Sequence, residues 1–281
     1  MTPNSAPEAV VSRYGDWMAS RYLSPETIRT ARYVLGALSR WAGGPILYLS
    51  AADLSRWQPH RARQITAPSL RNEISYLRGF YRWATREGLL SGDPSTVLDL
   101  PRAPRRLPRP IEDMALAEAM AGAPGEVRAA LGLAAFAGLR ACEIARLDWA
   151  EVTLDGEGPH LRVVGKGGHE RVVDIAPALA EILGRPGRGP VVRRLDGAAG
   201  PNRPARVSQL VNDHLHGLGL AETLHCARHR FGTAVYAASG DIRATQEAMG
   251  HASPTTTAGY AAVSRRNVRE AVLAAGTLRA G

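Results

Sequence analysis

A chain of 281 residues is long enough for two compact domains, and 45% hydrophobic with 22% charged residues is typical of a globular protein. No stretch approaches the roughly 20 apolar residues of a membrane-spanning helix, and the first residues lack the basic segment and apolar run of a signal peptide, so we expect no membrane association. The two cysteines, Cys142 and Cys226, have no metal-ligand spacing and cannot form a disulfide framework, so we expect no metal site and a reducing, cytoplasmic location.

The net charge of +9 favours a polyanionic partner such as nucleic acid, because each neutralised phosphate releases condensed counterions. Charge alone leaves open a basic protein whose charge only aids solubility. Among the 35 basic residues the only lysine is Lys166. Lysine, unlike arginine, can give up a proton near neutral pH, so position 166 is a candidate for proton transfer; a compositional bias with one accidental lysine explains the count equally well.

Two helical patterns stand out in the first hundred residues. The first runs from Ser24 to about Ala42, with Ser24 as the N-cap and Pro25 at the first helical position. The second runs from about Pro68 to Arg86 and repeats apolar residues along one face. These apolar residues are Leu70, Ile74, Leu77 and Tyr81.

The opposite face of the second helix carries a row of arginines: Arg71, Arg78, Arg82 and Arg86. Such a row suits a helix that lies against a phosphate backbone. A solvated basic surface is the commoner explanation unless other features indicate DNA binding.

Residues 99–110, D-L-P-R-A-P-R-R-L-P-R-P, are rich in proline and arginine and predict an extended basic linker. This linker separates two differently patterned halves. We therefore expect one domain over residues 1–98 and another over residues 111–281.

The second half combines helices with a small β-rich section. Strands are expected over residues 151–154, 160–164 and 171–175, with Lys166 in the turn of the hairpin formed by the last two. Helices are expected over residues 111–120, 126–137, 141–147, 177–183, 207–215, 225–238 and 242–249. A short helix that opens at Ser253 and Pro254 carries Tyr260, and an amphipathic segment over residues 266–278 ends the chain. The fold class is therefore mainly α with a small β-sheet.

This half contains the groups that metal-free cleavage of a phosphodiester requires: a nucleophile, cations for the phosphoryl oxygens, and an acid for the leaving oxygen. Arg140 lies at a corner between two helices, while His225 and Arg228 are three residues apart and share one helical face. His251 follows a helix-ending glycine, and Tyr260 lies nine residues further on. Each of these signals on its own is more often structural than functional.

Together, the motifs A-G-L-R-A-C-E, V-G-K-G-G-H-E-R-V, H-C-A-R-H and M-G-H, with a tyrosine nine residues after the last histidine, resemble the ordered signature of the tyrosine recombinases, the phage integrase family. The resemblance covers residues 111–260, and the first domain resembles the helical core-binding domain of that family. The implied fold is a helical core-type DNA-binding domain followed by an α+β catalytic domain. Cys142 and Ala227 depart from the residues that are frequent in the family, at positions where packing is expected to matter more than chemistry.

The resemblance implies a role for each matching residue. Arg140 and Arg228 resemble the two arginines that clamp the scissile phosphate, and Tyr260 resembles the nucleophile that forms a 3′-phosphotyrosyl bond. Lys166 is similar to the hairpin lysine that protonates the 5′-oxygen. The resemblance also implies a general-base or phosphate-contact role for His225, a phosphate contact for His251 and an orienting role for Glu143.

The implied function is that of a site-specific DNA recombinase, or integrase, which needs no metal, ATP or other cofactor. The implied partners are double-stranded DNA core sites and further copies of the chain in a tetramer on DNA, with residues 266–278 as an exchange segment; an accessory directionality factor is left open. The chain resembles the simple type that lacks an arm-binding domain. The expected DNA contacts are Arg71, Arg78, Arg82, Arg86, Arg105 and Arg106.

Two alternatives remain open from the sequence. A type IB topoisomerase shares the chemistry but works as a monomer, and it usually carries a different cation at the position of His225. A non-catalytic DNA-binding regulator derived from a recombinase would bind a specific site without forming a covalent adduct. The complete set of six active-site residues favours the recombinase.

Overall fold

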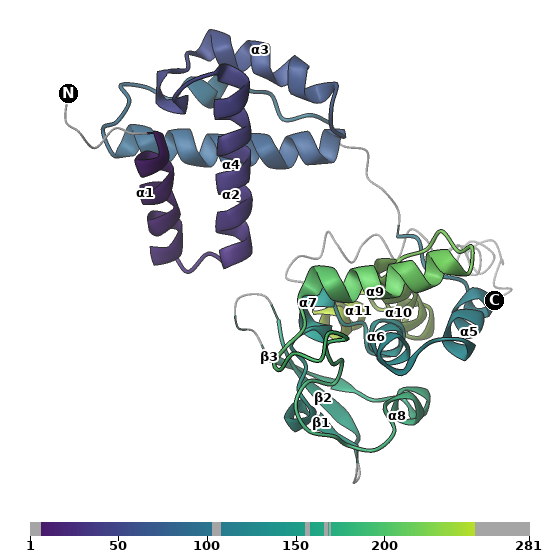
Figure 1. Cartoon of the computed structure of the whole chain (residues 1–281). Coiled ribbons are helices and arrows are strands. Elements are labelled where there is room, and N and C mark those ends of the chain that lie inside the picture. The colour runs from purple at the N-terminus through teal and green to yellow at the C-terminus, as the bar shows by residue number, and fades with distance from the viewer. Residues whose placement is uncertain (1–6, 103–107, 155–157, 166–167, 169, 251–281) are drawn as a thin grey trace, which may run out of the picture. The chain divides into compact units, whose positions relative to one another are not determined.

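The computed structural model describes residues 7–102, 108–154, 158–165, 168 and 170–250 (Figure 1). The chain divides into two compact units, residues 1–105 and residues 106–281, and the division falls within the proline- and arginine-rich stretch 99–110. In the described part of the chain, no helix has the length and apolar character that crossing a membrane requires.

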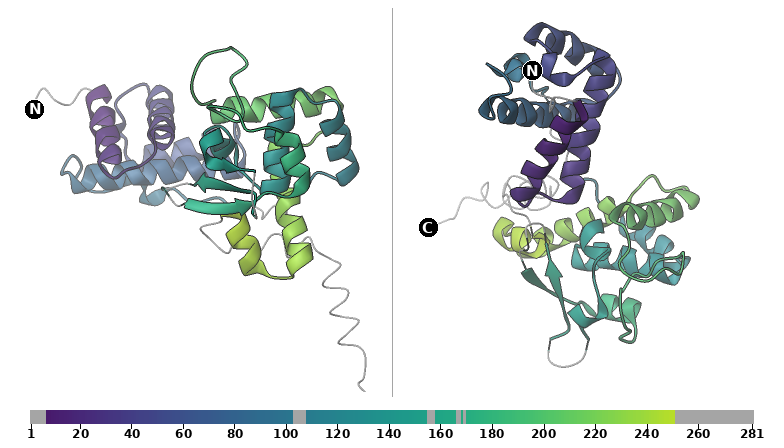
Figure 2. Two further views of the ribbon diagram at one scale, coloured as in Figure 1. Left: turned by 90° about the horizontal axis from the view of Figure 1, so that it is seen from below. Right: turned by 60° about the vertical axis from the view of Figure 1, so that its left-hand side comes forward.

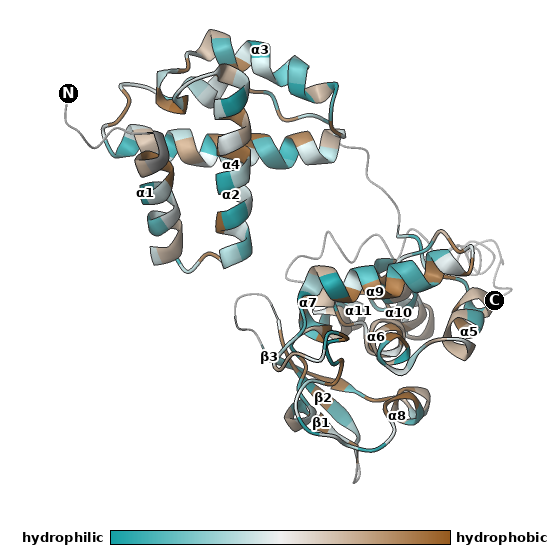
Figure 3. Cartoon of the chain, viewed as in Figure 1, coloured by the Kyte–Doolittle hydropathy of each residue, from teal (hydrophilic) through white to brown (hydrophobic). Residues whose placement is uncertain are grey.

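Within residues 7–102 the first unit is helical. Its α-helices are α1 (Pro7–Ser20), α2 (Pro25–Ala42), α3 (Ala51–Ala62) and α4 (Ala67–Arg86), and two short 3₁₀ turns are η1 (Ile46–Tyr48) and η2 (Pro94–Val97). α1 and α2 lie side by side, and α2 also packs against α4 (Figure 1). Hydrophilic and hydrophobic positions alternate along α2 and α4, as expected for helices with one buried face (Figure 3).

The two helices predicted in this unit are confirmed. Ser24 caps α2 by accepting a hydrogen bond from the backbone N–H of Thr27, and Gly43 ends the helix in the left-handed conformation with φ of 69°. The apolar residues predicted for one face of α4 are all buried: Leu70, Ile74, Leu77 and Tyr81.

α1 and α3 are two helices that were not predicted from the sequence. α1 buries Val10, Tyr14 and Met18 at a spacing of four residues, so the helical pattern was present but short. α3 contains Pro59 and buries only Leu54 and Trp57, which leaves a weak periodic signal.

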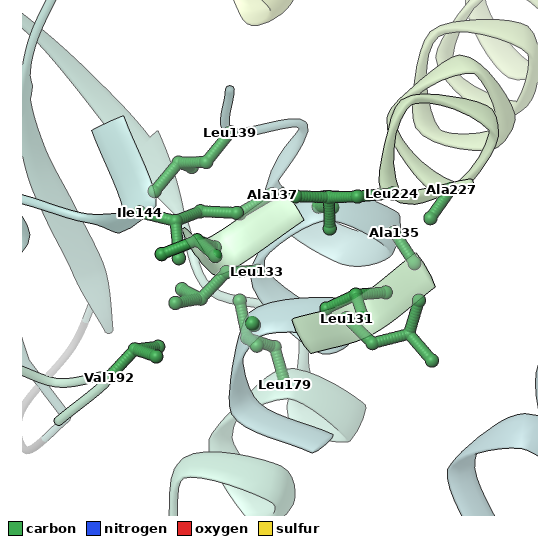
Figure 4. Packing of buried hydrophobic residues seen from close by; sticks show 14 of the residues in the cluster. Leu131, Leu133, Ala135, Ala137, Leu139, Ile144, Leu179, Val192, Leu224 and Ala227 are labelled. Carbon is green, nitrogen blue, oxygen red and sulfur yellow. The ribbon is translucent and has the colours of Figure 1, made fainter. Parts of the chain in front are cut away.

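The second unit packs its helices around α6. The helices described are α5 (Asp113–Ala121), α6 (Gly125–Ala137), α7 (Ala141–Ile144), α8 (Pro177–Leu183), α9 (Pro204–Gly217), α10 (Leu224–Ser239) and α11 (Ile242–Met249), together with the 3₁₀ turn η3 (Trp149–Glu151). α6 contacts α8, α9 and α10, and Leu131 and Leu133 lie in the core that these helices share (Figure 4). Burial on nearly all sides makes α6 the fixed frame of this unit.

A small antiparallel sheet lies beside these helices. Its strands are β1 (Val152–Thr153), β2 (His160–Val164) and β3 (Glu170–Asp174), in the order β1-β2-β3. In the predicted hairpin Val163 pairs with Arg171 and Val164 pairs with Glu170. β1 is shorter than predicted because the turn η3 takes its first position, and α7 ends three residues before the predicted Leu147. The expected fold class, mainly α with a small sheet, is confirmed.

Candidate active site

A glycine corner places Arg140. α6 ends at Gly138, which has a φ of 63° and whose missing Cβ leaves room for the ring of Phe231. Leu139 is fully buried, and Arg140 is then the N-cap of α7. Because the corner is fixed by buried residues on both sides, the side chain of Arg140 projects from a rigid frame with 34% of its surface exposed.

Glu143 gathers the charges around this corner. One carboxylate oxygen accepts a bond of 2.8 Å from the backbone N–H of Arg140, and the other accepts one of 2.9 Å from the Arg140 guanidinium. Arg171, on β3, donates two more bonds to the same carboxylate, of 3.0 and 2.9 Å. Only 2% of the Glu143 side chain is exposed, so this is a buried, charge-assisted network.

α10 contributes the second arginine of the predicted site. The Arg228 guanidinium is 3% exposed and lies 4.0 Å from the Glu143 carboxylate. Its Nη1 donates to the carbonyl of Gly138, and its Nη2 donates to the carbonyl of Met249 at 2.8 Å. Arg228 therefore ties α10 to the corner at Gly138 and to the end of α11. α10 and α11 pack against each other as the yellow-green pair in Figure 2.

The end of α11 meets both predicted arginines. Gly250 ends the helix with a φ of 59°, and its carbonyl accepts a 3.0 Å bond from Nη2 of Arg140. Two successive carbonyls, of Met249 and Gly250, are thus held by Arg228 and Arg140. The next residue, His251, lies outside the described residues.

The charges of the site shift the pKa values of its other groups. Burial opposes ionisation of Glu143, but the bonds from Arg171 and from the backbone of Arg140 outweigh it and hold the pKa of Glu143 below its usual value. Partial desolvation, with the charges of Arg228 and Arg140, lowers the pKa of His225. Three guanidinium groups around one carboxylate leave net positive charge, which favours an anion such as a phosphate.

His229 packs edge-to-face on His225, with 4.2 Å between the ring centroids. Desolvation, His225 and Arg228 lower the pKa of His229 to about 4. Both rings are therefore neutral near pH 7, and a neutral His225 can accept a proton.

The structure brings four of the predicted site residues together: Arg140, Glu143, His225 and Arg228. Five further predicted residues lie outside the described residues: Lys166, His251, Tyr260, Arg105 and Arg106. Among the described residues no group of three or more His, Cys, Asp and Glu side chains could hold a metal ion.

The predicted DNA contacts on α4 belong to the first unit, and two of them bind backbone there. Arg71 donates to the carbonyl of Pro101 at 3.2 Å, and the half-buried Arg78 donates to the carbonyl of Leu98. The Arg86 guanidinium lies over the ring of Trp17, 5.0 Å from its centroid. Arg71, Arg82 and Arg86 are exposed.

Arg171 is a site residue that the sequence does not predict. Its position at the start of a strand indicates which face it occupies, but strand alternation does not say which partner a side chain meets 28 residues away. The one sequence signal that could have identified Arg171 is its position in the motif V-G-K-G-G-H-E-R-V, five residues after Lys166.

Comparison with known proteins places the chain in a family. The model described as "Phage integrase, N-terminal SAM-like domain" matches residues 13–88, and the model "Phage integrase family" matches residues 202–267. A tyrosine recombinase XerC of Xylella fastidiosa is 33% identical over 259 residues, which cover 85% of this chain and 87% of the relative. A XerC of Rhodospirillum centenum is 32% identical over 287 residues, 92% of this chain and 84% of the relative.

The fold is also similar to solved structures. A lambda integrase dimer bound to a COC′ core site matches with a TM-score of 0.70 and 20% identity, over 90% of this chain and 76% of that chain. This likeness shows the fold, and the identity to the XerC proteins shows the family. The chain belongs to the tyrosine recombinase, or phage integrase, family and is a site-specific recombinase.

Proposed function

We propose that the chain cleaves and rejoins double-stranded DNA through a 3′-phosphotyrosine formed by Tyr260. The observation that carries this proposal is the convergence of Arg140 and Arg228 on Glu143 and on the end of α11. The chain continues from that point through His251 to Tyr260. The guanidinium groups of Arg140 and Arg228 thus bind the end of α11, and the tyrosine proposed as the nucleophile follows in the sequence.

In the proposed reaction the phenolic oxygen of Tyr260 attacks the phosphorus, and the bond from phosphorus to the 5′-oxygen breaks. His225, neutral near pH 7, accepts the phenolic proton, and Lys166 gives a proton to the leaving 5′-oxygen. Arg140 and Arg228, with His251, stabilise the charge on the phosphoryl oxygens, and Glu143 holds the arginines in place. Rejoining runs the same steps in reverse with a new 5′-hydroxyl as the attacking group.

The proposed organisation assigns residues 1–98 to core-site DNA binding, residues 99–110 to a basic linker and residues 111–281 to catalysis. The net charge of +9 and the exposed arginines of α4 support DNA binding. Matching structures include a lambda integrase tetramer bound to a Holliday junction, which supports a tetramer on two core sites here. Residues 266–278 are proposed to dock on a neighbouring copy, and an accessory directionality factor would act on this assembly.

Covalent capture tests the proposal. The purified chain is incubated with sheared genomic DNA from its source, denatured, and the DNA that stays attached is sequenced. We expect adducts at a small set of sites with the tyrosine at a 3′ end, and none with Tyr260→Phe. Adducts that survive Tyr260→Phe would refute the nucleophile. Binding without any adduct would favour a regulator, and relaxation of supercoils without site preference would favour a topoisomerase.

A further inference from the structure

Arg171 joins three parts of the candidate active site, although neither the family signature nor the proposed reaction gives it a role. It lies on β3, in the strand pair β2–β3, and its side chain is 14% exposed. Its two terminal nitrogens each donate to a different oxygen of Glu143 on α7. Such a two-bond pair fixes the orientation of both groups as well as their distance.

The same guanidinium packs on the end of α11. A Cβ added to Gly250 would lie 2.8 Å from Nη1 and 2.9 Å from Cζ of Arg171, so only a glycine leaves the arginine its place. The carbonyl of Gly250 is also the acceptor for Arg140. Arg171 therefore touches the residue that Arg140 holds and the carboxylate that orients Arg140.

Arg171 adds a polar tie to the apolar packing of the strand pair. Val163, which pairs with Arg171, and Val173 are buried in the core, whereas Val164 and Val172 are 49% and 66% exposed. Among the described residues, β3 reaches the helices by side-chain hydrogen bonds through Arg171. Residues 165–169 connect the two strands, and Lys166 is one of them.

Stability is a poor explanation for an arginine at this position. A buried ion pair often contributes no more to stability than well-packed apolar side chains would. The two-bond pair with Glu143 fixes the orientation of both groups, so a requirement for fixed geometry accounts for an arginine here.

We propose that Arg171 is a positioning residue: by pairing with Glu143 and packing on Gly250, it sets the strand pair β2–β3 relative to Arg140 and the end of α11. In the sequence, Lys166 belongs to the segment that connects these two strands. This inference rests on the proposed function, because it concerns the delivery of the proton from Lys166 to the 5′-oxygen. Arg171 itself touches neither the leaving oxygen nor the nucleophile in this scheme.

Two substrates distinguish a specific defect in proton delivery from a general loss of cleavage activity. The probes are two nicked duplexes with the sequence recovered by covalent capture, one with the natural 5′-oxygen and one with sulfur at the bridging 5′ position. A thiolate leaves without needing a proton, so a variant that is defective only in proton delivery should cleave the sulfur substrate at the normal rate. Lys166→Ala serves as the reference for that behaviour.

We expect Arg171→Gln to cleave the oxygen substrate roughly 100-fold more slowly, because misplacement by about 1 Å has that effect. It should cleave the sulfur substrate at close to the wild-type rate, and Arg171→Lys should recover part of the loss. Arg162→Gln is the matched control, since Arg162 makes a two-bond pair with Glu151 on the exposed side of β2. It should leave both rates unchanged.

Equal losses on the two substrates, or no loss on either, would overturn the role of Arg171. If Lys166→Ala itself failed to distinguish oxygen from sulfur, the proton-donor assignment of the proposed function would fail instead. The two failures are therefore distinguishable.

Amide hydrogen exchange of the protein without DNA gives a second readout. If Arg171→Gln is too poorly folded for kinetics, Arg171→Lys can be measured in the same way. Loss of the tie should speed amide exchange both in residues 160–174 and in residues 241–250. Arg162→Gln should affect only the first segment. Unchanged exchange in residues 241–250 would contradict the contact between Arg171 and the end of α11.

Discussion

At the residue scale, the buried carboxylate of Glu143 is the group on which the site depends. Two guanidinium groups bond it and a third lies 4.0 Å away. Glu143→Gln leaves buried positive charge without its counter-charge, which costs about 3–5 kcal/mol of folding free energy. Urea unfolding at pH 7 measures this loss. Asp113→Asn, which breaks the pair between Arg230 and an 81% exposed carboxylate, should cost less than about 1 kcal/mol.

The contribution of Glu143 depends on pH. Its pKa is lowered in the folded protein, so the stabilisation is present above the ordinary pKa of glutamate and is lost as the pH falls through the lowered folded value. The difference in unfolding free energy between the wild type and Glu143→Gln should therefore be constant near neutral pH and shrink in acid. A difference that grew on acidification would contradict the network.

His229 should also make the unfolding free energy depend on pH. Its folded pKa of about 4 lies below the ordinary value of 6.5, so between these pH values the unfolded chain binds a proton that the folded chain does not. Stability therefore falls as the pH drops from 6.5 toward 4. Replacing His229 with glutamine should reduce the slope of unfolding free energy against pH by nearly one proton in that window. Urea unfolding from pH 7.5 to 4.5 measures the slope, and an unchanged slope would contradict a half-buried, neutral His229 ring.

At the element scale, the glycine corner between α6 and α7 decides where Arg140 points. Gly138→Ala must place a Cβ against Phe231 and must also adopt a positive φ, so it should lose stability and cleavage together. Gly240→Ala, at the end of α10, has a φ of 65° but no atom within 4 Å of the added Cβ. It should show only the conformational cost of about 1 kcal/mol. Equal effects of the two changes on unfolding and on adduct formation would refute the role of the corner.

The sequence predicted elements where local signals were strong. The cap at Ser24, the apolar face of α4 and the hairpin could be predicted because each rests on residues close in the chain. α3 was missed because Pro59 and a narrow buried face weaken the pattern. In the site, residues named by the motif could be located, but the bond between Glu143 and Arg171 could not, since it depends on how a strand docks against a helix.

At the scale of the whole molecule, the first unit holds the chain beyond the predicted start of the linker. Gln58 makes two bonds to the backbone of Asp99, of 2.8 and 2.9 Å, and Leu98 is fully buried. Arg71 and Arg78 bind the carbonyls of Pro101 and Leu98. Some arginines on the basic face of α4 therefore bind the chain that follows this helix, whereas Arg82 is exposed. The spacing of the arginines in the sequence does not distinguish these two roles.

This difference predicts different consequences for two substitutions on one helix. Arg82 is exposed, so Arg82→Gln should weaken DNA binding and lower the slope of log affinity against log salt by about 0.9, the loss of one phosphate contact. Arg78 is half-buried and holds Leu98, so Arg78→Gln should keep the slope while making residues 98–102 more susceptible to limited proteolysis. Binding titrations over a range of salt concentrations and a proteolysis time course measure the two effects. If Arg78→Gln lowered the slope as much as Arg82→Gln without faster proteolysis, α4 would present one uniform DNA-binding face, and the anchoring of the chain after α4 would not depend on Arg78.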